Sequence, residues 1–277
     1  MWYKLFKVGL FGPGVRALWH PWVVGEENIP THGGAILACN HIELLDPVIL
    51  AAMIGRQLTY PAKKELFQAN KGLGSKVVAW FLKAVDQVPL DRSGGRRSVE
   101  GIRPVIDRLM EGGLVGIFPE GTRSADGELY KGKTGVARMA LMADAPVIPV
   151  ALVGTELVKG RFGIPKVDRP GIIIGRPLDF SALRGREEEV AVLRWVTNEV
   201  MDAIQQLGGQ AYVDVYGFRV KYGNLKGKDL TPWQRPRPGG VPVPPPVVSV
   251  PEPAASATAP EPDGPELADA TGTSEQS

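Results

Sequence analysis

The chain has 277 residues, of which 44% are hydrophobic, a formal net charge of +2 and a single cysteine. This length is enough for one large domain or two small ones with a sizeable core. One cysteine excludes an internal disulfide and a thiolate-cage zinc site. The last 27 residues carry six acidic side chains and no Lys or Arg, so the rest of the chain is more basic than the whole. A basic folded part favours an anionic partner, such as a phosphate ester, an anionic membrane surface or a nucleic acid.

The first 22 residues mix aromatic and basic side chains. Gly12, Pro13 and Arg16 interrupt the apolar run that a signal peptide would need, and no stretch approaches the roughly 18 apolar residues of a membrane span. Aromatic rings with cationic neighbours favour the headgroup layer of an anionic leaflet. We therefore predict that residues 1–22 form a helical element at a membrane interface. The alternative is a terminal helix that docks its aromatic rings on the core.

Short apolar runs alternate with helical patterns over residues 23–215, which indicates a single α/β domain with a mixed central sheet flanked by helices. The predicted strands are Ala35–Cys39, Gln57–Ala62, Val85–Leu90, Leu114–Phe118, Val147–Val153 and Gly171–Gly175. The predicted helices are Pro47–Ile54, Leu73–Lys83, Arg96–Met110, Lys133–Ala143 and Arg186–Leu207. On the last helix, three- and four-residue spacing predicts one apolar stripe: Val190, Leu193, Val196, Val200 and Ile204.

The C-terminal part differs in composition. Between Pro232 and Pro265 lie 12 of the 25 prolines. A segment with so few large apolar side chains does not offset the entropy lost on ordering, so residues 232–277 are predicted to be a disordered tail. Residues 216–231 are interpreted as a connecting segment between this tail and the domain.

The run that ends in Asn40-His41 delivers a histidine from a buried strand into a loop, and Asp46-Pro47 then begins a helix. The simplest interpretation is that Asp46 caps the helix and His41 is an ordinary loop residue. However, imidazole is the side chain best suited to proton transfer near neutral pH, and a nearby carboxylate fixes its tautomer. Five residues across a bend can bring Asp46 against one ring nitrogen of His41. We therefore predict that His41 is a general base oriented by Asp46.

The sequence offers no convincing nucleophile of its own. Cys39 lies inside a strand run, where alternation points it into the core and a thiol acts as a small hydrophobe. The Gly-x-Ser-x-Gly pattern of a nucleophile elbow does not occur. A base without a protein nucleophile favours direct attack by a hydroxyl group of a substrate.

A second polar cluster follows the strand that ends at Phe118. Glu120 is suited to line a site or to hold a guanidinium, Gly121 permits close backbone approach, Thr122 brings a hydroxyl, and Arg123 brings a planar fork that suits phosphate. Lys63 and Arg92 also follow apolar stretches. Ligand sites in α/β sheets collect at the carboxyl ends of strands, so these polar groups are candidates for one site. The alternative is a set of solvated turns.

One competing motif is present. Residues 127–134, Gly-Glu-Leu-Tyr-Lys-Gly-Lys-Thr, satisfy the pattern of a nucleotide-binding phosphate loop. The context argues against it, because eight residues separate Gly127 from the preceding strand and Glu128 would repel phosphate. We interpret this stretch as a loop that leads into a helix near Lys133.

These residues together resemble the glycerolipid acyltransferases, specifically the 1-acylglycerol-3-phosphate acyltransferases. The His41-x4-Asp46 pair resembles the catalytic motif of that family, and the segments 85–92, 118–124 and 147–154 resemble its three other blocks in the same order. The Lys63-Lys64-Glu65-Leu66 stretch is also similar. The resemblance covers about residues 20–180, and the combination of blocks is far more specific than any one of them.

The resemblance implies that an acyl thioester, acyl-CoA or acyl-carrier protein, transfers its acyl group to the free hydroxyl of lysophosphatidic acid and gives phosphatidic acid for phospholipid biosynthesis. His41 would be the base and Asp46 its orienter, with no cofactor, metal or nucleic acid. The implied substrate-binding residues are Lys63, Arg92, Glu120, Gly121, Thr122 and Arg123. The implied location is the cytoplasmic face of the cell membrane, bound peripherally. One alternative is an acyltransferase that acts on another lysophospholipid or on glycerol phosphate. The other is a lipid-binding protein without catalysis.

Overall fold

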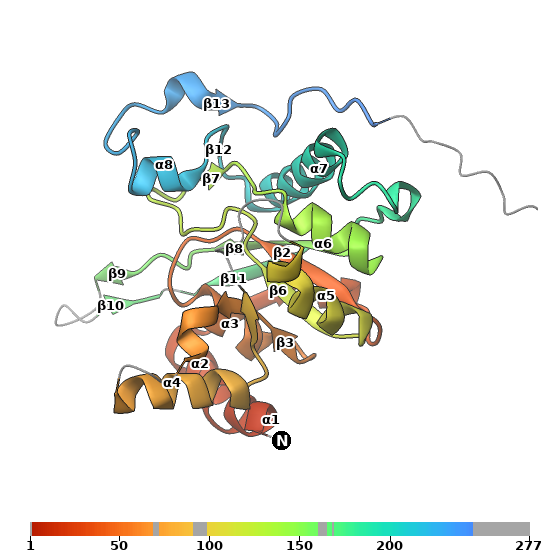
Figure 1. The fold of residues 1–277 in the computed structure, drawn as a ribbon. Coiled ribbons are helices and arrows are strands. Elements are labelled where there is room, and N and C mark those ends of the chain that lie inside the picture. The colour runs from red at the N-terminus through yellow and green to blue at the C-terminus, as the bar shows by residue number, and fades with distance from the viewer. Residues whose placement is uncertain (1, 69–71, 91–98, 160–164, 168, 246–277) are drawn as a thin grey trace, which may run out of the picture. The chain divides into compact units, whose positions relative to one another are not determined.

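The computed structural model describes residues 2–68, 72–90, 99–159, 165–167 and 169–245. Its centre is a six-stranded sheet with the strand order β1–β11–β8–β2–β6–β3 (Figure 1). The strands are β1 (Trp22–Val24), β2 (Ala35–Cys39), β3 (Leu58–Thr59), β6 (Leu114–Ile117), β8 (Val147–Val153) and β11 (Gly171–Ile174). Neighbouring strands from β8 to β3 run parallel, whereas β11 is antiparallel to β8. The predicted α/β fold with a mixed sheet is therefore confirmed.

Side chains of β2 alternate between two hydrophobic cores, as the two-residue period of a strand requires. Ile36 and Ala38 face one core, and Leu37 and Cys39 face the other. All five residues of β2 are buried. A strand covered on both faces reads as a continuous apolar run, which is why its bounds could be predicted correctly.

Helices cover both faces of this sheet. The helices are α1 (Trp2–Phe6), α2 (Gly12–Trp19), α3 (Asp46–Met53), α4 (Leu73–Ala84), α5 (Arg103–Met110), α6 (Gly135–Ala143), α7 (Val190–Gly208) and α8 (Gly217–Lys221), and a π-helical turn, Lys7–Phe11, joins α1 to α2. Helices α5, α6 and α7 pack against the face that carries Ile36, and α3 packs against the face that carries Leu37. The predicted stripe on α7 is confirmed except for Val190, which is 68% exposed because the helix begins there, at the domain surface.

The described strands outside the central sheet form three smaller, separate sheets. They are the parallel pair β4 (Pro61–Lys63) and β5 (Val88–Leu90), the antiparallel pair β9 (Val158–Lys159) and β10 (Pro165–Lys166), and a three-stranded sheet of β7 (Leu129–Tyr130), β12 (Tyr212–Val213) and β13 (Gln234–Arg235). A third hydrophobic cluster lies under this last sheet and under α8. These strands have two or three residues each, too few for a periodic pattern, so most of them escaped prediction.

The C-terminal boundaries differ from those predicted. Residues 216–231, interpreted as a connecting segment, contain α8, whose Val220 is buried in the third cluster. Beyond the predicted start of the tail at 232, β13 pairs with β12, and Arg237 forms ion pairs with Glu199 and Asp202 of α7. Backbone hydrogen bonds, these ion pairs and the packing of Trp233 against the third cluster hold this stretch. Such isolated contacts leave no periodic apolar pattern in the sequence. Residues 246–277 lie outside the described residues.

The N-terminal element is helical, as predicted, and half of it packs inward. Tyr3 is buried, and its hydroxyl accepts a hydrogen bond of 2.9 Å from the backbone N–H of Leu58. Phe6 contacts Phe81 of α4 with ring centroids 5.6 Å apart, and Trp2 contacts Trp80 at 5.8 Å. Some aromatic rings of this element therefore pack against α4, whereas others stay exposed to solvent. The reason is that α4 covers only one side of the element. No described helix combines the length and the apolar content that crossing a membrane requires.

Candidate active site

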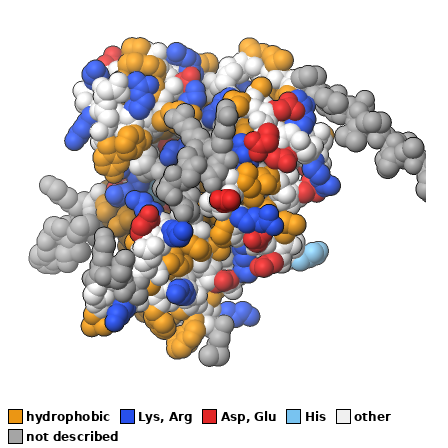
Figure 2. All heavy atoms as spheres, viewed as in Figure 1, with side chains coloured by type: hydrophobic (Ala, Val, Ile, Leu, Met, Phe, Trp, Pro, Cys, Tyr) orange, Lys and Arg blue, Asp and Glu red, His pale blue; other side chains and the backbone are white. Residues whose placement is uncertain are grey.

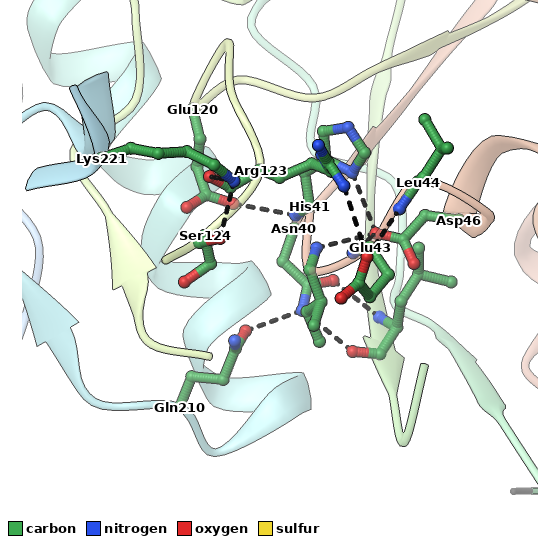
Figure 3. A network of polar contacts seen from close by, with 12 residues as sticks. Asn40, His41, Glu43, Leu44, Asp46, Glu120, Arg123, Ser124, Gln210 and Lys221 are labelled. Carbon is green, nitrogen blue, oxygen red and sulfur yellow. Dashed lines mark hydrogen bonds and ion pairs between the residues drawn. The ribbon is translucent and has the colours of Figure 1, made fainter. Parts of the chain in front are cut away.

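His41 and Asp46 meet at the carboxyl end of β2 (Figure 3). The Nδ1 atom of His41 lies 2.9 Å from Oδ2 of Asp46. The same oxygen accepts the backbone N–H groups of Ile42 at 2.7 Å and Glu43 at 2.8 Å. Asp46 is fully buried, and Pro47 follows it in the first turn of α3, where the absent N–H of proline costs nothing. The loop is thus folded around one carboxylate, which fixes the position of the imidazole.

This geometry determines which ring nitrogen can act as a base. A carboxylate accepts hydrogen bonds only, so Nδ1 of His41 carries the proton that it donates to Asp46. The lone pair of the neutral ring is then on Nε2, for which the described residues supply no hydrogen-bond partner. Phe118 stacks on the ring with centroids 4.1 Å apart, and Tyr60 stacks on Phe118. The imidazole is held by a carboxylate at one edge and by an aromatic face, and it can take a proton at Nε2.

Glu120 is held inside the protein by two backbone groups. Its Oε1 accepts the N–H of His41 at 2.8 Å, and its Oε2 accepts the N–H of Tyr130 at 3.0 Å. Glu120 is 1% exposed, and burial raises the pKa of its carboxyl group to about 8 against the opposing effect of these two hydrogen bonds. Glu120 therefore positions the His41 loop, and both of its oxygens are occupied by the protein itself.

The loop after Glu120 is tied to the His41 loop. Gly121 has φ +70°, the left-handed region that favours glycine, and its N–H donates to the carbonyl of Phe118 at 3.0 Å. The N–H of Ser124 donates to the carbonyl of His41 at 2.7 Å. Between them, Arg123 forms a loose ion pair with Glu43 at 3.4 Å. The guanidinium predicted to bind phosphate thus lies beside the predicted base.

The other predicted residues are less closely tied to this centre. Thr122 lies against α8, since its Cγ2 would be 3.2 Å from a Cβ atom at Gly217. Lys63 is exposed at the end of β4, where it pairs in register with Leu90 of β5. No contact joins Lys63 to His41 among the described residues. Arg92 lies outside the described residues.

Three residues with a structural part in the site were missed. The Asn40 side chain forms two hydrogen bonds with the backbone of Leu152, at 2.7 and 2.9 Å, and donates to Gln210 at 2.7 Å. Lys221 of α8 donates to the carbonyl groups of Arg123 and Ser124 at 3.2 Å each (Figure 3). Asn40 directly precedes the histidine, which is a usable signal. Gln210 and Lys221 have no such signal, because their partners are far away in the sequence.

The structure also bears on two rejected interpretations, Cys39 as a nucleophile and residues 127–134 as a nucleotide-binding phosphate loop. Cys39 is fully buried, and burial raises the pKa of its thiol well above the usual range, which opposes the thiolate that a nucleophile needs. In the stretch that matches the phosphate-loop pattern, residues 129–130 form β7 and α6 begins only at Gly135, after the motif. A strand inside the pattern leaves no continuous loop to cradle phosphates. Among the described residues no cluster of three metal-ligating side chains occurs.

The chain is similar to known acyltransferases. Residues 20–153 match the family model of the acyltransferases. The 1-acyl-sn-glycerol-3-phosphate acyltransferase of Bacillus subtilis (strain 168) is 35% identical over 189 residues, which are 67% of this chain and 88% of that protein. The chain belongs to the 1-acylglycerol-3-phosphate acyltransferase family. The resemblance predicted from the motifs is therefore confirmed, and the protein is an acyltransferase of this family.

More distant relatives carry the same family name. A chloroplastic 1-acyl-sn-glycerol-3-phosphate acyltransferase of Arabidopsis thaliana is 30% identical over 159 residues, 56% of this chain and 43% of that protein. Among solved structures, the 1-acyl-sn-glycerophosphate acyltransferase PlsC of Thermotoga maritima has a similar fold, with a TM-score of 0.53 and 23% identity over 73% of this chain and 77% of that one. The family match ends at residue 153, so α7 and α8 lie outside it.

Proposed function

We propose that this acyltransferase moves a fatty acyl group from a thioester to the free hydroxyl of lysophosphatidic acid and releases phosphatidic acid. The observation that carries the proposal is the buried Asp46 carboxylate 2.9 Å from Nδ1 of His41, with the guanidinium of Arg123 on the adjoining loop. The names of the relatives suggest lysophosphatidic acid as the acceptor. Such an acceptor needs a base for its hydroxyl group and a cation for its phosphate, and His41 and Arg123 are suited to these two roles.

The reaction needs one base and no acyl-enzyme. Nε2 of His41 accepts the proton of the acceptor hydroxyl as its oxygen attacks the thioester carbonyl carbon. The buried carboxylate of Asp46 stabilises the imidazolium that forms. The tetrahedral intermediate then expels the thiol sulfur, which takes the proton from the imidazolium. The bond broken is C–S, the bond formed is C–O, and the histidine returns to its neutral state.

The phosphate of the acceptor is the second point of recognition. Arg123 is half-buried and only loosely paired with Glu43, so its fork can rotate toward a phosphate group. Lys63 and Arg92 are proposed to complete this set, with Gly121 and Thr122 shaping the loop. We assign Glu120 to positioning, since its carboxylate is turned toward the backbone.

The test is an acyl-transfer assay with purified full-length protein, lysophosphatidic acid and a long-chain acyl-CoA. His41→Ala is expected to lower kcat by about 10²–10⁴-fold, the usual contribution of a general base. His32→Ala is the matched control, because His32 is exposed and its ring forms a hydrogen bond with the neighbouring Thr31. Full activity of His41→Ala would refute the assigned base. A parent protein that binds lysolipid but transfers nothing from any donor would support the non-catalytic alternative.

The acceptor is tested separately. Arg123→Ala is expected to raise KM for lysophosphatidic acid and to leave a phosphate-free acceptor, such as a monoacylglycerol, little affected. Arg103→Ala is the control, since Arg103 is an exposed arginine of α5 paired with Asp107. Equal losses with both acceptors would reject the anchoring role of Arg123. Faster turnover of glycerol phosphate or of another lysophospholipid would favour the alternative acceptors.

We further propose that the protein binds an anionic membrane peripherally through α1, the π-helical turn Lys7–Phe11, α2 and α4. Their exposed apolar side chains lie among lysines, as Figure 2 shows at the lower end of the molecule, where Figure 1 places α1 and α4. The most exposed of them are Leu5, Val8, Leu10, Leu18, Leu73 and Val77. Such a surface suits the headgroup layer of a bilayer, from which a lysolipid chain could reach the site.

Sedimentation with phosphatidylglycerol–phosphatidylcholine vesicles tests this surface. The double variant Val8→Glu/Leu73→Glu is chosen because these side chains are 70% and 79% exposed, so the fold should tolerate charged residues at both positions. We expect the bound fraction to fall strongly. Val190→Glu on α7 is the control with the same chemistry at an exposed site elsewhere. Unchanged partitioning of the double variant would place membrane contact on another surface.

A further inference from the structure

A cavity of about 500 Å³ opens beside the His41 loop. One wall consists of the catalytic loops, with Ile42, Glu43 and Arg123, and the other consists of α8 and the turn after it. This second wall lies beyond residue 153, where the family match ends. The volume falls within the usual range of small-molecule sites, roughly 300–1,000 Å³. A concave site of this size adjoins the predicted catalytic centre, and the steps proposed above use only Arg123 of its lining and none of its lysines.

The cavity is lined by cations that lack carboxylate partners. Lys226 and Lys228 are exposed and form no ion pair within the described part of the chain. Lys221 donates only to carbonyl oxygens, and burial together with nearby Arg123 lowers its pKa. Within the described part of the chain, none of these three ammonium groups is ion-paired with a carboxylate, although Glu43 and Asp126 also line the cavity.

The acids of the same cavity are already engaged. Glu43 pairs with Arg123 at 3.4 Å, and Asp126 accepts the hydroxyl of Tyr130 at 2.8 Å. Four cationic side chains against two carboxylates leave the cavity with an excess of positive charge, which attracts a ligand with several negative charges. With Arg123 assigned to the acceptor, three lysines remain for a ligand with more than one phosphate group.

The position of the cavity separates it from the proposed membrane surface. Helix α8 lies at the upper end of the view in Figure 1, and α1 and α4 lie at the lower end. Figure 2 shows several Lys and Arg side chains at the α8 end of the molecule, next to a hydrophobic patch, and further hydrophobic side chains at the opposite end. The cavity therefore lies at the end of the molecule opposite to the proposed membrane surface.

We infer that this cavity binds the nucleotide phosphates of a CoA thioester, with Lys221, Lys226 and Lys228 as their ligands. The inference rests on the proposed acyl transfer, because it assigns the donor of that reaction. CoA carries a diphosphate and a 3′-phosphate in one compact group, which matches several ammonium groups around one cavity. A carrier protein presents a single phosphodiester and needs a broad surface, which a cavity of this size does not offer.

The kinetic test compares donors. We expect Lys226→Gln/Lys228→Gln to raise KM for palmitoyl-CoA about tenfold, as the loss of two partly exposed charge contacts would, and to leave KM for palmitoyl-pantetheine unchanged. Arg103→Gln/Arg219→Gln is the control, since it removes two exposed positive charges outside the cavity. Equal effects on both donors, an effect matched by the control, or an effect only on lysophosphatidic acid or on palmitoyl-carrier protein would each overturn the inference.

A binding test does not require turnover. Isothermal titration calorimetry of free CoA into the parent and the double-lysine variant should show about tenfold weaker binding by the variant. Equal binding would overturn the inference even if acyl transfer occurs. Conversely, a parent that binds CoA through these lysines but acylates no lysophosphatidic acid would refute the proposed acceptor and leave this site in place.

Discussion

The buried carboxyl group of Glu120 predicts an unusual dependence of stability on pH. Burial raises its pKa to about 8 in the folded protein, whereas the unfolded chain titrates near the ordinary value of 4.5. Below pH 4.5 both states are protonated and the group costs nothing. As pH rises from 4.5 to about 8, only the unfolded state loses its proton, so the folded state is progressively destabilised.

The magnitude follows from these two values. Each pH unit within this window lowers the free energy of unfolding by about 1.4 kcal/mol, so the loss between pH 5 and pH 8 is about 4 kcal/mol. Glu120→Gln cannot titrate and should remove this slope. The amide also turns one N–H toward a backbone N–H of His41 or Tyr130, which adds a penalty of about 1–3 kcal/mol that does not change with pH.

The assay is urea denaturation followed by tryptophan fluorescence at several pH values between 5 and 8. The quantity of interest is the stability of the parent minus that of Glu120→Gln, in which contributions of other titrating groups cancel. Glu111→Gln, at an exposed glutamate, is the control and should give a flat difference. A flat difference for Glu120→Gln as well would mean that the two N–H groups keep the carboxylate ionised, and the reasoning from burial would be wrong.

Three further substitutions test the site and the core. Asp46→Asn keeps an acceptor oxygen for the three N–H donors that Oδ2 of Asp46 binds, but it loses the charge that stabilises the imidazolium. We therefore expect kcat to fall by about 10²–10⁴-fold with little change in KM. A larger effect on KM would indicate a role in binding. Gly121→Ala adds a Cβ atom to a residue with φ +70°, and this atom would lie 2.7 Å from Nζ of Lys133. We expect the protein to lose about 1 kcal/mol of stability and some activity. An unchanged thermal unfolding temperature would show that the loop relaxes freely. Leu37→Ala at a fully buried strand position should cost about 2–5 kcal/mol in urea denaturation, and a cost below 1 kcal/mol would contradict the packing described for β2.

Local patterns in the sequence were sufficient to predict the main elements and the contact between His41 and Asp46. Strands β2 and β8 were predicted residue for residue, because a strand buried on both faces is a continuous apolar run. His41 and Asp46 are five residues apart, so a single bend brings them together. The loop at 120–124 could be recognised because its residue types and order carry the chemistry by themselves.

The tertiary structure decided what the sequence left open, namely which distant groups meet this loop. Glu120 reaches the backbone of His41 across 79 residues, and Lys221 reaches that of Arg123 across 98. Such contacts depend on the packing of whole elements, and a single glutamate or lysine has no periodicity that reveals its partner. The roles of Glu120 in positioning and of α8 in forming the lysine-lined cavity therefore follow only from the folded chain. The motif residues, in contrast, are fixed by local order and chemistry.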